Sequence, residues 1–95
     1  PFFIFINHYL RLTTNMNFTV FSKVGCSYCE KVKKILELTS SSFVVYTLGE
    51  HFDEKAFTDE FGYGTTFPQV ICDGKKLGGT VETVKFLREQ KIISV

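Results

Sequence analysis

Two cysteines in the sequence Cys-Ser-Tyr-Cys, Cys26 and Cys29, have a spacing at which thiols can do redox chemistry. A short apolar run rich in β-formers, Phe18–Ser22, precedes them, and apolar residues at helical spacing follow from Tyr28 to Thr39. A C-x-x-C pair between a strand and a helix is typical of thiol–disulfide exchange. The same two thiols could instead be half of a zinc site, so other residues must decide between these chemistries.

The two thiols are expected to play different roles. The attacking species is the thiolate, and a free cysteine with a pKa of about 8.5 is mostly protonated at neutral pH. Cys26 lies at the expected helix N-terminus, where unpaired N–H groups and the helix dipole stabilise negative charge. Lys23 adds a nearby cation, so we expect the pKa of Cys26 to be lowered. Cys26 is then the nucleophile, and Cys29, on the apolar helix face, is the buried thiol that resolves the mixed disulfide.

A zinc site would need two further ligands. The candidates are Cys72, His51 and His8, and none of them makes a second C-x-x-C or an H-x₃₋₅-H pair. Cys72 lies in an apolar, strand-like run and is expected to be a buried small apolar residue. We therefore expect no metal site.

The rest of the chain predicts the elements that position the dithiol. We expect a strand at 43–48, a helix that Asp53 caps and that ends before Gly62, strands at 68–72 and 75–77, and a last helix that Thr80 caps and that ends near Gln90. Asp73-Gly74 is a two-residue turn typical of a β-hairpin. The order β-α-β-α-β-β-α predicts two parallel strands with a right-handed crossover, then an antiparallel hairpin. The fold class is α/β, with a mixed four-stranded sheet flanked by helices on both faces.

Size, charge and cysteine count narrow the function. A chain of 95 residues makes one domain. The net charge of +1, with lysines concentrated only at Lys31, Lys33 and Lys34, argues against nucleic acid as a partner. The apolar run Phe2–Ile6 is far shorter than the ~20 residues that span a bilayer, so we expect no membrane association. Three cysteines are an odd set for a disulfide-stapled secreted domain, which favours a reducing compartment such as the cytoplasm.

The start of the chain is unusual. It opens on Pro1, and its one methionine is Met16. We expect the natural product to begin at Met16. Residues 1–15 would then be a non-native or disordered extension, and residues 16–95 the domain.

Two further stretches bear on the site. Pro68 opens a predicted strand, and because proline cannot donate to the ladder it belongs at an edge or a break. Gly78-Gly79 precedes the last helix and lets a backbone or ligand approach closely. That helix start also offers N–H groups to an anion such as a carboxylate. Each stretch alone has an ordinary structural explanation.

Taken together, the motifs resemble the glutaredoxin family over about residues 17–92. They are K-x-x-C-x-Y-C, then T-x-P about forty residues later, then Gly-Gly at the start of the last helix. The sequence looks most like small phage-type or bacterial-type members. The resemblance implies a thioredoxin-like fold with Pro68 in the cis form. It also implies an oxidoreductase that reduces protein disulfides and glutathione mixed disulfides, with glutathione as the reductant.

The resemblance also implies a place for glutathione. Its cysteine would pair with the backbone of Phe67, its glycine carboxylate would meet Lys23, and Tyr28 would flank the mixed disulfide. Its γ-glutamyl carboxylate would lie at the start of the last helix. The implied glutathione-binding residues are Lys23, Tyr28, Thr66, Phe67, Pro68, Gly79, Thr80, Val81 and Glu82.

The sequence departs from the family pattern in three places. Phe67 stands where members often carry valine, which makes the wall of the groove bulkier. Tyr63, Gly64 and Thr65 replace a basic residue that many members carry before T-x-P, so the glycine end depends more on Lys23. Val81 stands where Thr, Ser or Asp is common, which removes one side-chain hydrogen bond to the ligand. These changes bear on glutathione affinity more than on the reaction.

Two alternative functions stay open. One is a thioredoxin-type reductant that receives its electrons from a flavoprotein reductase. The presence of Lys23, Tyr28 and the Gly-Gly helix start argues against this alternative. The other is a [2Fe–2S] carrier or sensor, because Ser27 replaces the proline common in dithiol members and some relatives with C-S-Y-C bind such a cluster. The expected partners are glutathione and disulfide-containing client proteins, with ribonucleotide reductase as one family client. We expect a monomer, in the host cytoplasm if the source is viral.

Overall fold

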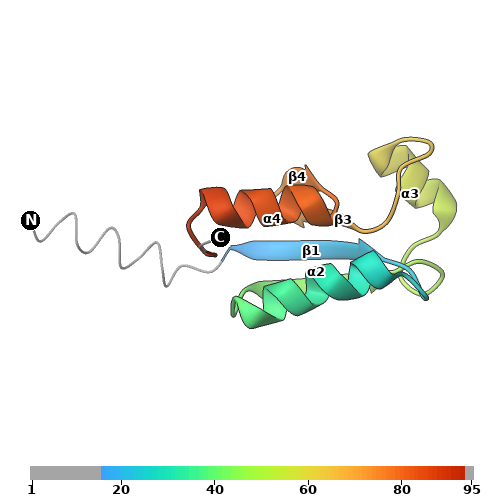
Figure 1. Cartoon of the computed structure of the whole chain (residues 1–95). Coiled ribbons are helices and arrows are strands. Elements are labelled where there is room, and N and C mark those ends of the chain that lie inside the picture. The colour runs from blue at the N-terminus through green and yellow to red at the C-terminus, as the bar shows by residue number, and fades with distance from the viewer. Residues whose placement is uncertain (1–15, 94–95) are drawn as a thin grey trace, which may run out of the picture.

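The structure is a computed structural model that describes residues 16–93. Its elements, shown in Figure 1, are β1 (Asn17–Ser22), α2 (Ser27–Leu38), β2 (Ser42–Thr47), α3 (Glu54–Phe61), β3 (Gln69–Cys72), β4 (Lys75–Gly78) and α4 (Thr80–Glu89). This order confirms the predicted β-α-β-α-β-β-α sequence. The predicted extension of residues 1–15 lies outside the described residues, so its boundary stays a prediction. No helix in residues 16–93 has the length and apolar character needed to cross a bilayer.

The four strands form one mixed sheet in the order β2-β1-β3-β4. β1 and β2 are parallel, and α2 connects them. β3 runs antiparallel to β1, with Gln69 opposite Phe21, and β4 runs antiparallel to β3. The turn residues Asp73 and Gly74 have φ angles of 48° and 85°, which is the region that a two-residue hairpin turn requires. The predicted parallel pair and antiparallel hairpin are both confirmed.

The main core lies on one face of this sheet. Along β1, Phe18, Val20 and Ser22 are buried while the residues between them are only half-buried, as expected for a strand with one covered face. The buried side chains that pack with them come from α2, β3 and α4: Val32, Leu36, Val70, Cys72 and Leu87. α2 and α4 therefore cover the same face of the sheet, and the burial of Cys72 agrees with its prediction as a small apolar residue.

α3 covers the other face at one end of the sheet. Phe21 points to that face, and its ring lies 5.4 Å from the ring of Phe52 and 5.2 Å from the ring of Phe61. Phe61 and Phe57, four residues apart in α3, have ring centroids 4.9 Å apart, as expected for two side chains on one helix face. Helices therefore cover both faces of the sheet, as predicted.

The strand ends bring the motif residues to one edge of the sheet. β1 ends at Ser22, and its antiparallel partner β3 begins at Gln69, so Pro68 lies near the end of β1. β4 ends at Gly78 opposite Val70, which places the start of α4 at the same edge. Figure 1 shows α2 and α4 both starting at the end of the sheet where the β1 arrow ends. Residues some fifty positions apart in the sequence thus meet at one edge.

The start of α4 differs from its prediction by one residue, and the difference has a physical cause. Gly79, not Thr80, is the N-cap, and the Glu82 carboxylate accepts a hydrogen bond from the Gly79 N–H at 2.8 Å. The Thr80 side chain does not cap the helix, because its hydroxyl donates to the backbone carbonyl of Tyr28 at 3.1 Å. The prediction of Thr80 as the cap is therefore wrong, since a tertiary contact uses its hydroxyl.

Candidate active site

The two cysteines lie at the first turn of α2, and they are joined as a disulfide. Cys26 is the N-cap residue, with an extended backbone (φ −107°), and its Sγ accepts a hydrogen bond from the Cys29 N–H at 3.1 Å. Gly25, at φ +75°, makes the turn between β1 and the helix, a conformation that glycine adopts without strain. Cys26 thus lies where the orphan N–H groups of a helix stabilise a thiolate, as expected.

The two sulfurs differ sharply in exposure. Cys26 is half-buried, whereas Cys29 is 0% exposed, with Val32 and Leu36 on the same buried face of α2. A client disulfide can therefore approach Cys26 but not Cys29. The Cα atoms of the pair are 5.2 Å apart, within the usual range for a disulfide, so the pair can close without moving the backbone. This difference in access supports the predicted roles of nucleophile and resolving thiol.

The third cysteine, Cys72, lies away from the active-site end of the sheet. Cys72 ends β3 opposite Phe18, the second residue of β1, whereas the C-x-x-C pair follows the last residue of β1. Burial, together with the neighbouring Asp73 carboxylate, raises the pKa of Cys72 to about 11. Within residues 16–93, no three His, Cys, Asp or Glu side chains gather in a way that could hold a metal ion. Cys72 is a neutral core thiol at physiological pH.

The T-x-P stretch places a cis peptide next to β3. The Phe67–Pro68 bond is cis, as the family resemblance implies, and Pro68 is buried. A Cβ atom built on Gly79 would lie 3.5 Å from the Pro68 carbonyl oxygen, so the start of α4 packs closely against this proline. Thr66 is exposed, and its carbonyl accepts a hydrogen bond from the Gln69 side chain at 2.9 Å.

The Gly-Gly stretch makes the close turn from β4 into α4. Gly78 has φ +117°, and a Cβ atom there would lie 2.9 Å from Cγ of Glu82. Only glycine fits this conformation and this space. The Glu82 carboxylate accepts a hydrogen bond from the first N–H of the turn, which is that of Gly79. The next N–H groups, those of Thr80 and Val81, have no intrahelical partner by the geometry of a helix start, and Val81 is 75% exposed.

Two contacts tie these stretches to the dithiol. The hydroxyl of Thr80 donates to the carbonyl of Tyr28, which lies between the two cysteines, so α4 is hydrogen-bonded to the active-site turn. The ammonium of Lys23 lies over the ring of Phe67, 5.4 Å from its centroid. Tyr28, two residues after Cys26, is 59% exposed. The structure therefore brings Lys23, Tyr28, Phe67 and Thr80 to one site, while Thr66 and Val81 are exposed at its border.

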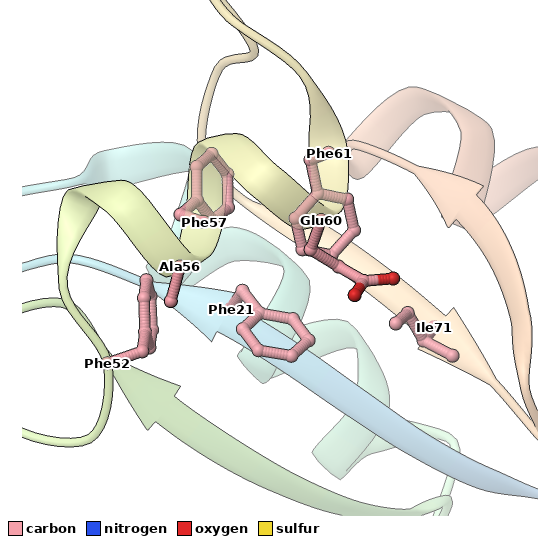
Figure 2. A pocket seen from close by; sticks show the side chains of 7 residues that line it. All are labelled: Phe21, Phe52, Ala56, Phe57, Glu60, Phe61 and Ile71. Carbon is pink, nitrogen blue, oxygen red and sulfur yellow. The ribbon is translucent and has the colours of Figure 1, made fainter.

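Sequence reasoning missed an aromatic cluster beside this site. Phe52, Phe57 and Phe67 stack on one another, and the Phe57 and Phe67 centroids are only 4.2 Å apart with their planes 17° from parallel. Phe21 extends the cluster into a pocket of about 390 Å³, which Figure 2 shows around its ring. The pocket is lined by Phe21, Phe52, Ala56, Phe57, Glu60, Phe61 and Ile71. Spacing could have indicated only the Phe57–Phe61 pair, because the other rings come from separate elements.

A histidine also has a role that the sequence did not indicate. His51 lies in the turn between β2 and α3. Its Nδ1 accepts a hydrogen bond from the Thr47 N–H at 2.9 Å, so it closes the turn after β2. The role is structural, and the residue lies on the α3 side of the molecule, where its ring packs against Tyr46 at 5.7 Å.

Comparisons with known proteins agree with this geometry. The glutaredoxin family profile matches residues 18–77. The chain is similar to a glutaredoxin of Vernicia fordii, with 32% identity over 85 residues that cover 86% of this chain and 82% of the relative. Among solved structures it is similar to glutaredoxin 1 of Francisella tularensis in complex with cacodylate, with TM-score 0.67 and 23% identity over 81% of this chain and 96% of that one. It is also similar to buckwheat glutaredoxin in complex with glutathione, with TM-score 0.67 and 26% identity over 92% of this chain and 82% of that one.

The structural likeness confirms the predicted fold class. The mixed four-stranded sheet and three helices follow the thioredoxin-like order of these solved structures. The Cys26–Cys29 pair occupies the position of a C-x-x-C active site in that order, at the start of the helix that follows the central strand β1.

Proposed function

The chain belongs to the glutaredoxin family of thiol–disulfide oxidoreductases, and we propose that it reduces protein disulfides and glutathione mixed disulfides with glutathione as the electron donor. One observation carries the proposal above the others. Cys26 is half-buried at a helix N-terminus, and it forms a disulfide with Cys29, which lies three residues later and is fully buried. This arrangement admits a substrate to one sulfur only and keeps the second sulfur for the intramolecular step.

The reaction with a protein disulfide takes two exchanges. The Cys26 thiolate attacks one client sulfur, so a Cys26–client bond forms and the other client sulfur leaves as a thiolate. Cys29 then loses its proton and attacks Cys26 Sγ, which releases the reduced client and leaves the Cys26–Cys29 disulfide. Two electrons pass from the dithiol to the client. The Cys29 N–H bond to Cys26 Sγ supports the thiolate form in the first step and in the regeneration.

Two glutathione molecules restore the dithiol. The first attacks Cys26 Sγ, which frees Cys29 and leaves glutathione bonded to Cys26. The second attacks the glutathione sulfur of this mixed disulfide and yields oxidised glutathione and the Cys26 thiolate. The same last step removes glutathione from a glutathionylated client after transfer to Cys26. Cys29 is needed only where a protein disulfide is the substrate.

The edge residues give glutathione a place to bind. The groove would run from Lys23, at its glycine carboxylate, past the Phe67 backbone to the start of α4. The exposed first turn of α4 offers the N–H groups of Thr80 and Val81 to the γ-glutamyl carboxylate. Since Glu82 already accepts the Gly79 N–H, we assign Glu82 to shaping this helix start rather than to direct contact with the ligand. The solved complex of the similar buckwheat glutaredoxin with glutathione supports glutathione as the ligand.

A glutathione-coupled reductase assay tests the proposal. NADPH consumption through glutathione reductase is followed with a mixed disulfide and with a protein disulfide as substrates. We expect Cys26→Ser to lose both activities, and Cys29→Ser to keep deglutathionylation but lose reduction of the protein disulfide. Cys72→Ser, a change at the buried core thiol, is the matched control and should keep both. Full activity of Cys26→Ser would refute the assignment.

The same assay can identify the electron donor and test candidate client proteins. Replacing glutathione and its reductase by thioredoxin reductase should give far slower turnover, and the reverse result would favour the thioredoxin-type alternative. Ribonucleotide reductase is one client to assay first. We further propose that the protein acts as a monomer in a reducing, cytoplasmic setting. The odd number of cysteines and the free, buried thiol of Cys72 support the reducing setting.

A further inference from the structure

The ring of Phe67 lies between the ring of Phe57, which belongs to α3, and the ammonium group of Lys23. On one face, the ring of Phe57 stacks against it with centroids 4.2 Å apart and planes 17° from parallel. Phe57 is itself only 6% exposed, so this stacking surface is held by the packed part of the molecule. A stacked ring at this distance leaves no room for an ammonium on that face. The Lys23 ammonium, 5.4 Å from the Phe67 centroid, therefore lies over the other face.

The Lys23 side chain is exposed and has no ion-pair partner among residues 16–93. A free lysine side chain samples many rotamers, and it loses this conformational entropy when it binds a carboxylate. The π face of Phe67 attracts the ammonium and restricts it to one region before a ligand arrives. An ammonium over a ring keeps N–H groups that point away from the ring, and these can still donate to an anion.

We propose that Phe67 is a specificity-determining residue that holds the Lys23 cation in place to recognise the carboxylate at the glycine end of glutathione. The inference rests on the proposed function and adds a role for the Phe67 side chain, beyond the backbone pairing. The uncharged Tyr63-Gly64-Thr65 segment before T-x-P makes this cation more important. Phe57, which Figure 2 shows on α3, is the residue whose ring stacks on Phe67 and orients it.

The expected effect is small and measurable. A cation–π contact at an exposed site contributes ~0.5–1 kcal/mol. At about 1.4 kcal/mol for each factor of ten, its loss should raise the apparent KM for glutathione about 2- to 5-fold. Phe67→Leu removes the π face and keeps an apolar side chain, whereas Phe67→Tyr keeps the face. We expect the rise in KM for Phe67→Leu, an unchanged kcat, and wild-type values for Phe67→Tyr.

A double-mutant cycle with Lys23→Met separates this role from packing. Lys23→Met removes the charge at an exposed position and keeps most of the side-chain stem. In that background Phe67→Leu should add almost nothing to the KM for glutathione. Glutathione monoethyl ester, which lacks the charge of the glycine carboxylate, should likewise make Phe67→Leu and wild type indistinguishable. Lys34→Met, at an exposed lysine on α2, is the control for general loss of positive charge.

An NMR measurement tests the geometry without any substrate. The ring current of Phe67 should shift the Lys23 ε-methylene protons upfield of those of Lys34, and Phe67→Leu should remove that shift while Phe67→Tyr keeps it. Thermal unfolding checks that each variant folds, and Phe67→Met replaces Phe67→Leu if the latter is unfolded.

Three results would overturn the inference: an equal rise in KM with and without the Lys23 charge, an unchanged or lower KM in Phe67→Leu, or an unshifted Lys23 resonance. Wild-type protein without any glutathione-dependent turnover would refute the proposed function as well. Normal wild-type turnover with an insensitive Phe67→Leu variant would refute only the role of Phe67.

Discussion

Replacing Gly78 by alanine should lower the free energy of unfolding by roughly 2–4 kcal/mol, because it strains the backbone and displaces the cap of α4. At φ +117° a residue with a Cβ atom is strained by about 1–3 kcal/mol. The new Cβ would also lie 2.9 Å from Cγ and 3.0 Å from Cβ of Glu82. Rotation of the Glu82 side chain can move Cγ away, but it cannot move Cβ, which is fixed to the helix.

The displaced Glu82 side chain would lose its hydrogen bond to the Gly79 N–H, an N-terminal capping interaction that contributes about 1 kcal/mol. Urea unfolding followed by circular dichroism measures the total. Gly49→Ala is the matched control, because Gly49 also has a positive φ, +88°, yet has nothing within 4 Å of its built Cβ. We expect Gly78→Ala to be more destabilising than Gly49→Ala by at least the contribution of the lost cap, about 1 kcal/mol.

The double variant Gly78→Ala/Glu82→Ala separates the two causes. Glu82→Ala alone removes the cap, so the cap cannot be lost a second time in the double variant. The contact with Cγ is absent as well. The double variant should therefore be destabilised by less than the sum of the single variants. Equal effects of Gly78→Ala and Gly49→Ala, or strict additivity with Glu82→Ala, would refute the reasoning about this turn.

Three other predictions follow from single contacts. Thr80→Val should lower the unfolding free energy by about 1 kcal/mol through loss of the hydroxyl bond to the Tyr28 carbonyl, whereas Thr80→Ser should keep it, as urea unfolding of both would show. Cys72 ionises near its ordinary pKa of 9.0 in the unfolded chain but near 11 in the fold, so its contribution to stability is complete below pH 9 and is lost as the pH rises towards 11. Cys72→Ala should show a smaller decline in stability over that interval, and an identical decline would contradict the assignment. Asp53→Ala removes the cap of α3, a 2.8 Å bond to a backbone N–H, and should destabilise by about 1 kcal/mol in the same urea assay, with Asp53→Asn close to wild type.

Most of the fold could be predicted because its signals are local. The Asp73-Gly74 turn, the Asp53 cap and the run of β-formers at Phe18–Ser22 each depend on residues close in the chain. Those signals set the element order, and the handedness of a β-α-β connection then leaves few arrangements of the sheet. The N-terminal position of Cys26 and the burial of Cys29 followed from the same helical pattern.

The details of the site could not be predicted in the same way. The hydroxyl of Thr80 could equally have capped its own helix, and only the packing of α4 against α2 brings the Tyr28 carbonyl within its reach. The Glu82 carboxylate was expected to lie near the ligand, and the tight turn at Gly78 turns it towards the Gly79 N–H instead. In both cases the sequence offers two partners for one polar group, and distances across the fold select between them.

The sequence by itself determined the chemistry of this protein: a dithiol at a helix start, with one thiol accessible and the other buried. That much depends on spacing within a few residues, where covalent geometry and helix periodicity leave little freedom. Only the tertiary structure decided how the surrounding groups are held. Phe57, Phe67 and Lys23 come from three separate segments, and their stacking arises because α3 and the strand ends pack against the same edge of the sheet. Contacts between distant segments depend on how whole elements pack, and no local pattern encodes that packing.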